Sequence, residues 1–140
     1  FEESTLYLTW QENPQTTMTV QWLSQNEQPV SLFYQKEGEM AWKEVAVEKY
    51  FFYSLFLARA DLKSLEPAAA YRFRIEEQIF RFKTLPDTFP LRFVEGGDLY
   101  HGSGSFMEKT CKEAAKTNPM FAVLGGDIAY VLTKTGTVKE

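Results

Sequence analysis

The chain has 140 residues and a formal net charge of −4, with 44% hydrophobic and 24% charged residues. This composition is typical of a folded domain rather than a disordered tail, and the acidic balance argues against a nucleic-acid-binding surface. No apolar run approaches the ~20 residues that a membrane-spanning helix needs, so we expect no membrane span.

Residues 5–84 contain short runs that alternate between apolar and polar side chains. The runs 6–10 and 17–22 have a period of two, and Asn13-Pro14 supplies a turn signal between them. Further strands are predicted over 30–35, 41–47, 50–60, 71–75 and 79–84. Short strands at this spacing, separated by polar turns, predict an all-β sandwich.

Aromatic residues locate the interior of this sandwich. Trp22 lies on the second predicted strand, and its large side chain suits the gap of ~10 Å between two packed sheets. Residues 62–71 have the form of a tyrosine corner, in which the hydroxyl of Tyr71 bonds back to the preceding loop. The alternative is that Tyr71 is an ordinary core residue. We also assign the aromatic residues of 51–56 to the core rather than to an exposed recognition surface.

The composition changes at 85–90, where Pro86 and Pro90 flank a polar pair. We take this stretch as a boundary between two domains, the first over 1–87 and the second over 88–140. The second is too short to hold an independent core. We therefore expect the sequence to be the N-terminal piece of a larger protein whose remainder covers the apolar residues of the second domain.

The second domain is predicted to consist of a strand, a helix and a strand. The strands cover 91–95 and 120–124, and the helix runs from an N-cap at Ser105 to about Thr117, with Glu108 completing a capping box. The uniformly apolar run 120–124 is typical of a parallel strand that is covered on both faces. Together the three elements predict a βαβ unit with a right-handed crossover.

Both strands of this unit are followed by Gly-Gly-Asp, first at 96–98 and again at 125–127. Ligands of α/β sheets bind outside the carboxyl ends of the strands, and adjacent strands lie ~4.8 Å apart. Asp98 and Asp127 could therefore both reach a pair of metal ions ~3.5–4 Å apart, and Tyr130 follows within one turn. A single Gly-Gly-Asp would indicate only a turn, but two in one βαβ unit favour a metal site.

The only histidine and the only cysteine are weaker candidates for metal ligands. His101 follows Asp98 in the first loop, and we expect it to face solvent, with an added ligand role as the less favoured alternative. Cys111 is expected to be a small apolar residue of the helix that packs on the sheet.

Several stretches resemble the purple acid phosphatase family. Thr9-Trp-Gln11 and Thr17-Met-Thr-Val-Gln-Trp22 look like the opening of the family's N-terminal domain, and the segments 59–67, 71–74 and 80–86 continue the match in order. The resemblance implies a fibronectin type III-like sandwich over 1–87. Gly126-Asp-Ile-Ala-Tyr130 is similar to the family's Gly-Asp-x-x-Tyr block, so residues 88–140 would be the first βαβ unit of an α/β metallophosphoesterase domain.

The same resemblance implies roles for three residues. Asp98 would be a terminal ligand of a ferric ion, Asp127 the carboxylate that bridges two metals, and Tyr130 the ferric phenolate ligand. The implied cofactor is a binuclear centre of iron plus a divalent ion (zinc, manganese or iron), and the implied reaction is the hydrolysis of phosphate monoesters. The implied location is secreted, periplasmic or in the cell envelope.

Two departures from the family's pattern limit what this stretch could do alone. The residues after Asp98 are Leu99-Tyr-His-Gly102, where a small residue two or three positions on is usual. The later asparagine and histidine ligands are not among these 140 residues. We therefore expect this stretch by itself to hold no stable binuclear site and to hydrolyse no phosphate ester, with the remainder of the catalytic domain as its partner. The alternative from another class is a non-catalytic binding module for a protein or a carbohydrate, with a degenerate metallophosphoesterase remnant.

Overall fold

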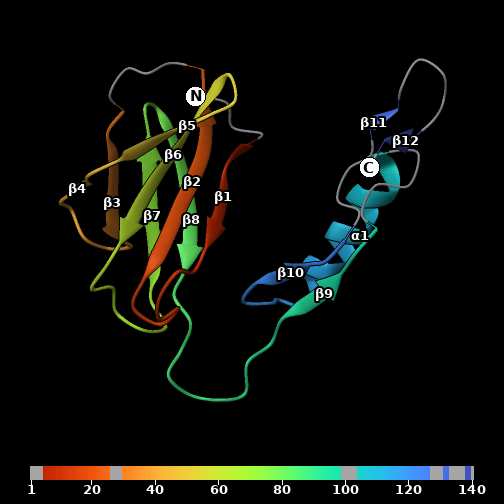
Figure 1. The fold of residues 1–140 in the computed structure, drawn as a ribbon. Helices are drawn as coiled ribbons and strands as arrows, with labels where there is room; N and C mark the ends of the chain where they lie inside the picture. The colour runs from red at the N-terminus through yellow and green to blue at the C-terminus, as the bar shows by residue number, and fades with distance from the viewer. Residues whose placement is uncertain (1–4, 26–29, 99–103, 127–130, 133–137, 140) are drawn as a thin grey trace. The chain divides into compact units, whose positions relative to one another are not determined.

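The computed structural model describes residues 5–25, 30–98, 104–126, 131–132 and 138–139. The chain forms two compact units, Phe1–Phe89 and Pro90–Glu140, which we call the sandwich unit and the second unit (Figure 1). Within the described ranges, no helix is both long enough and apolar enough to cross a membrane.

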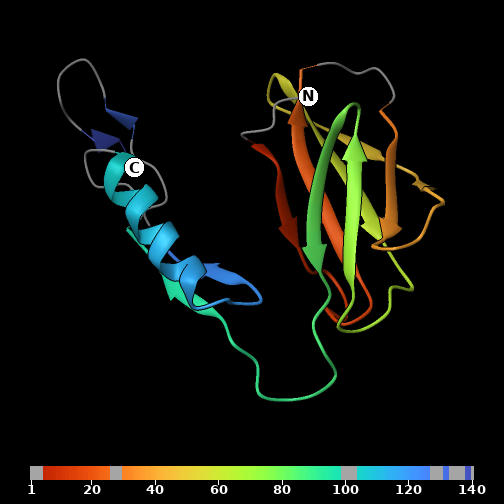
Figure 2. The same ribbon diagram turned by 180° about the vertical axis from the view of Figure 1, so that it is seen from behind.

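The described part of the sandwich unit contains eight strands in two antiparallel sheets. The strands are β1 (Tyr7–Thr9), β2 (Met18–Ser24), β3 (Leu32–Lys36), β4 (Lys43–Val45), β5 (Glu48–Phe52), β6 (Leu55–Leu62), β7 (Ala70–Ile75) and β8 (Gln78–Lys83). The strand orders are β1-β2-β6-β5 and β4-β3-β7-β8. The first sheet lies nearer the viewer in Figure 1 and the second in Figure 2. The predicted all-β sandwich is therefore confirmed.

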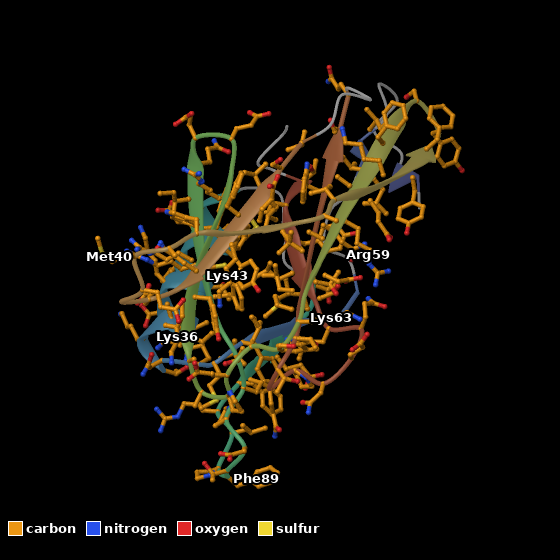
Figure 3. All side chains as sticks on the ribbon, turned by 90° about the vertical axis from the view of Figure 1, so that its left-hand side faces the viewer. Lys36, Met40, Lys43, Arg59, Lys63 and Phe89 are labelled. Atoms are coloured by element: carbon orange, nitrogen blue, oxygen red, sulfur yellow. The ribbon has the colours of Figure 1, made fainter. Side chains whose placement is uncertain are left out.

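The core lies between the two sheets, where the period-two pattern directs one face of each strand inward. Trp22 and Phe73 are the largest fully buried side chains, at 0% and 1% exposed. Ala58 lies opposite Trp22 on β6, so a small residue leaves room for the indole. Seen edge-on in Figure 3, Lys43 marks one sheet and Arg59 the other, with the core between them. The predicted inward position of Trp22 is confirmed.

The stretch 50–60, predicted as one buried strand, is instead the β5–β6 hairpin. Phe51 pairs with Phe56 across it, and the chain turns at Tyr53, which has a left-handed φ of 56°. Phe51 is 71% and Tyr53 85% exposed, so their assignment to the core was wrong. The sequence hides this turn because no Gly, Pro, Asn or Asp marks it, and such residues are the usual signal for a positive φ.

The loop before β7 is fastened by two side chains. The backbone N–H of Glu66 donates a hydrogen bond to the Tyr71 hydroxyl at 2.8 Å, which confirms the tyrosine corner. The buried hydroxyl of Thr84 donates to the carbonyl of Glu66 at 2.6 Å and accepts from the N–H of Ala69 at 3.0 Å. The Tyr71 ring also stacks on Phe82, so the residue serves both the corner and the core.

We expect Tyr71→Phe to lower the free energy of unfolding by about 1 kcal/mol, because it keeps the ring and leaves the Glu66 N–H without its acceptor. Urea denaturation followed by fluorescence measures this change. Tyr34→Phe is the matched control. The ring centres of Tyr34 and Tyr71 lie 6.5 Å apart, and the Tyr34 hydroxyl makes no hydrogen bond to the described residues. Equal losses in the two variants would contradict the role of the corner.

The second unit contains short strands and one helix in its described part. The elements are β9 (Val94–Gly96), α1 (Gly104–Lys116), β10 (Ala122–Leu124), β11 (Val131–Leu132) and β12 (Val138–Lys139). β9 and β10 pair in parallel, with Val94 opposite Ala122, and α1 lies between them in sequence. The helix begins at Gly104, so Ser105 is inside its first turn rather than at the N-cap.

Most apolar side chains described in the second unit are exposed. Phe93 and Leu124 are each 50% exposed and Phe106 is 64% exposed. Cys111 is exposed as well, so its predicted packing on the sheet was wrong. The reason is length: α1 extends for about 20 Å, whereas strands of three residues extend for only about 10 Å and offer little surface to cover it.

Candidate metal centre

Gly96-Gly97 and Gly125-Gly126 stand at the carboxyl ends of β9 and β10, and we call these two segments the Gly-Gly exits. The two exits lie against each other. The N–H of Gly125 donates a hydrogen bond to the carbonyl of Gly96 at 2.9 Å, which continues the β9–β10 ladder past its last pair. A Cβ on Gly97 would lie only 2.0 Å from the carbonyl oxygen of Gly125. No side chain fits there, so residue 97 is a glycine because the neighbouring backbone occupies the space.

A residue with a left-handed backbone conformation lies at the end of each described exit. Asp98 has a left-handed φ of 49°, which is uncommon for a residue other than glycine and costs on the order of 1 kcal/mol. Gly126, in the second exit, also has a positive φ of 67°. Asp98 is therefore held in a strained, exposed turn beside the other exit. The consecutive glycines were the sequence signal for the close contact between the two exits, but nothing in the sequence indicated the conformation of Asp98.

Of the predicted ligands, only Asp98 belongs to the described part of the chain. Asp127, Tyr130 and His101 lie outside the described residues. The metal-ligand roles of all these residues, Asp98 included, stay predictions. Gly126, which immediately precedes Asp127, is described and lies on the exit that contacts Gly97. No group of three or more His, Cys, Asp or Glu side chains suited to a metal ion occurs among the described residues.

The described residues fit a metal site in two respects. The carboxylate of Asp98 is an oxygen donor, the kind of ligand that hard cations prefer. A Cβ on Gly96, Gly125 or Gly126 would meet no atom of the described residues within 4 Å, in contrast to a Cβ on Gly97. The edge can therefore admit a bound group close to the backbone while the two exits stay in contact.

Among the described residues, another connected charged cluster lies on the β2–β6 pair of the sandwich unit. Arg59 donates hydrogen bonds to both carboxylate oxygens of Asp61, and the Thr19 hydroxyl donates to the same carboxylate at 2.6 Å. Burial raises the pKa of Asp61, but the hydrogen bonds from Thr19 and Arg59 outweigh it and hold that pKa below its usual range. Because these groups satisfy one another, the cluster joins two strands and offers no reactive carboxylate.

Comparison with known proteins decides the family. The family model described as the purple acid phosphatase N-terminal domain matches residues 4–84, which span β1 to β8. The chain belongs to the purple acid phosphatase family. This family is generally metal-dependent, and the matched residues cover the sandwich unit while the candidate metal centre follows them in the second unit.

Two solved structures have weaker similarity. The sensor domain of the anti-sigma factor RsgI4 from Pseudobacteroides cellulosolvens is 18% identical, with a TM-score of 0.41, over 61% of this chain and 99% of that one. Astrotactin-2, a vertebrate-specific, perforin-like membrane protein, is 16% identical, with a TM-score of 0.43, over 77% of this chain and 28% of that one. Both likenesses are too low to bear on the function of this chain. No curated protein matches it.

We expect Gly97→Ala to separate the two exits of this purple acid phosphatase family member, because the added Cβ clashes with the Gly125 carbonyl. The hydrogen bond from Gly125 to Gly96 should then open more often, and exchange of the Gly125 amide hydrogen should accelerate by about tenfold or more, which corresponds to ~1.4 kcal/mol. Hydrogen exchange followed by NMR measures this rate. Gly96→Ala is the matched control, since a Cβ there meets open space. Similar rates in both variants would refute the contact.

Proposed function

We propose that the second unit is the beginning of a metallophosphoesterase domain, and that this chain is the N-terminal part of a binuclear phosphatase that hydrolyses phosphate monoesters. The observation that carries the proposal is the contact between two Gly-Gly exits, each of which is followed by an aspartate in the sequence. Membership of the purple acid phosphatase family supports the reaction class. The parallel pairing of β9 and β10 supports the placement of both aspartates at one sheet edge.

The chain's own residues would hold the metals from this edge. Asp98, fixed in its left-handed turn, would be a terminal ligand of a ferric ion, and Asp127 would bridge to a divalent ion. Tyr130 would give the ferric ion a phenolate ligand. When bound, the two metals supply an activated water and neutralise the phosphoryl oxygens of the substrate.

The proposed site also needs groups beyond these three. Asp98, Asp127 and Tyr130 provide oxygen donors only, whereas borderline divalent ions such as zinc are commonly bound through imidazole. We propose that later parts of the catalytic domain supply the missing asparagine and histidine ligands. The exposed side chains of Phe93, Val123 and Leu124 support this partner, because further sheet packed beside β9 and β10 would cover them.

The proposal predicts the behaviour of the complete gene product. It should bind two metals and hydrolyse p-nitrophenyl phosphate, and Asp127→Asn should lower kcat/KM on the order of 100-fold or more, as for other groups that organise transition-state charge. Tyr130→Phe should remove the visible charge-transfer absorption of the ferric phenolate. Asp87→Asn is the control, because this exposed carboxylate belongs to the sandwich unit and not to the candidate metal centre. A metal-free product, or full activity in Asp127→Asn, would overturn the proposal.

A further inference from the structure

The outer face of the β4-β3-β7-β8 sheet carries an arginine that two aromatic rings hold in place. Residues of β7 alternate, so Phe73 and Ile75 are buried while Arg74 lies on the outer face. The guanidinium carbon of Arg74 lies 4.7 Å from the ring centre of Phe33, its cross-strand neighbour on β3, and 5.0 Å from that of Trp42. Stacking of this kind uses the flat face of a guanidinium and leaves its edge N–H groups to donate hydrogen bonds.

Trp42 is itself held against the sheet by a polar layer beneath it. Arg72 donates a hydrogen bond to Gln35 at 3.1 Å, and its guanidinium carbon lies 5.9 Å from the ring centre of Trp42. Gln35 is only 2% exposed although it is on the outer face. The indole therefore covers this layer from solvent, and its position over Arg74 is set before any ligand arrives.

A hollow of about 290 Å³ opens beside Arg74. The described residues that line it are Val30, Ser31, Phe33, Arg74, Glu76 and Glu77. The hydroxyl of Ser31 donates to Glu44 at 2.6 Å, so that nearby carboxylate has a partner of its own. Among the described residues, no carboxylate forms an ion pair with Arg74. Within the described ranges, the edge donors of Arg74 therefore have no anionic partner, and they lie beside an open hollow.

We infer that this hollow binds a neutral, polyhydroxylated ligand of the carbohydrate class. Glu76 and Glu77 would repel a carboxylate or phosphate, and Arg74 would repel a cation. Hydroxyl groups satisfy both charges, since they accept from the guanidinium and donate to the carboxylate of Glu77. Val30 and Phe33 offer apolar contact for the C–H face of a sugar ring. This inference concerns the sandwich unit and does not rest on the proposed phosphatase activity.

The test is an NMR titration of the ¹⁵N-labelled 140-residue chain with four neutral disaccharides: cellobiose, maltose, mannobiose and chitobiose. At least one disaccharide should shift the amide signals of Phe33, Arg74 and Glu77 saturably. Arg74→Lys should weaken that binding by about tenfold, because lysine lacks the planar, forked N–H donors of the guanidinium. Arg81→Lys is the matched control: Arg81 is exposed on the neighbouring strand β8 and pairs with Glu37 at 3.2 Å. No saturable shift with any of the four, or equal affinity in Arg74→Lys and Arg81→Lys, would overturn the inference.

A second variant tests the charge argument separately. Replacing both Glu76→Gln and Glu77→Gln keeps hydrogen-bonding groups but removes the repulsion of anions, so this double variant should gain binding of sodium acetate at Arg74. The wild-type chain should bind acetate at least about tenfold more weakly than the double variant does. Acetate binding of equal strength in both proteins would contradict selection by these carboxylates.

Discussion

The candidate metal centre depends on one backbone contact, the approach of the Gly125 carbonyl to the place where a side chain on residue 97 would lie. A β-sheet ladder by itself brings strand ends only to ordinary pairing distance. Removing the side chain at 97 allows the second exit to approach more closely than the ladder requires. The next residue, Asp98, has a left-handed φ of 49°, so backbone strain lies where a ligand would be held. The metal site proposed for this edge therefore requires glycine at position 97.

The two units differ in how they are stabilised. The sandwich unit buries Trp22 and Phe73 between its sheets and fastens the loop before β7 with Tyr71 and Thr84. It therefore has a core of its own, and its outer face can carry the separate Arg74 hollow. The second unit has a parallel strand pair with apolar side chains that stay exposed, Phe93 among them. This exposure supports the proposal that the second unit is one edge of a larger sheet.

The sequence predicted features that follow from periodicity or from a local bond, and missed those that depend on a turn or a long-range approach. Alternation on β2 and β7 revealed the sandwich, and the spacing before Tyr71 revealed the corner. The β5–β6 turn at Tyr53 was missed because tertiary structure imposes its positive φ on an aromatic residue. The position of Trp42 over Arg74 was equally hidden, since no sequence repeat relates a loop residue to the fourth strand after it. At the candidate metal centre, strand ends and glycines correctly placed Asp98 beside the second exit, but the metal-ligand roles of Asp98, Asp127 and Tyr130 all stay predictions.

The most direct test of the central claim is paramagnetic broadening by Mn²⁺ in NMR spectra of the ¹⁵N-labelled chain, because it detects even weak binding at the sheet edge. The account predicts that the amide signals of residues 96–98 and 125–127 broaden together at the same Mn²⁺ concentration. It also predicts that Asp98→Asn reduces the broadening at both segments. Broadening confined to one of the two segments, or unchanged in Asp98→Asn, would contradict the claim that the two Gly-Gly-Asp ends form one metal-binding edge.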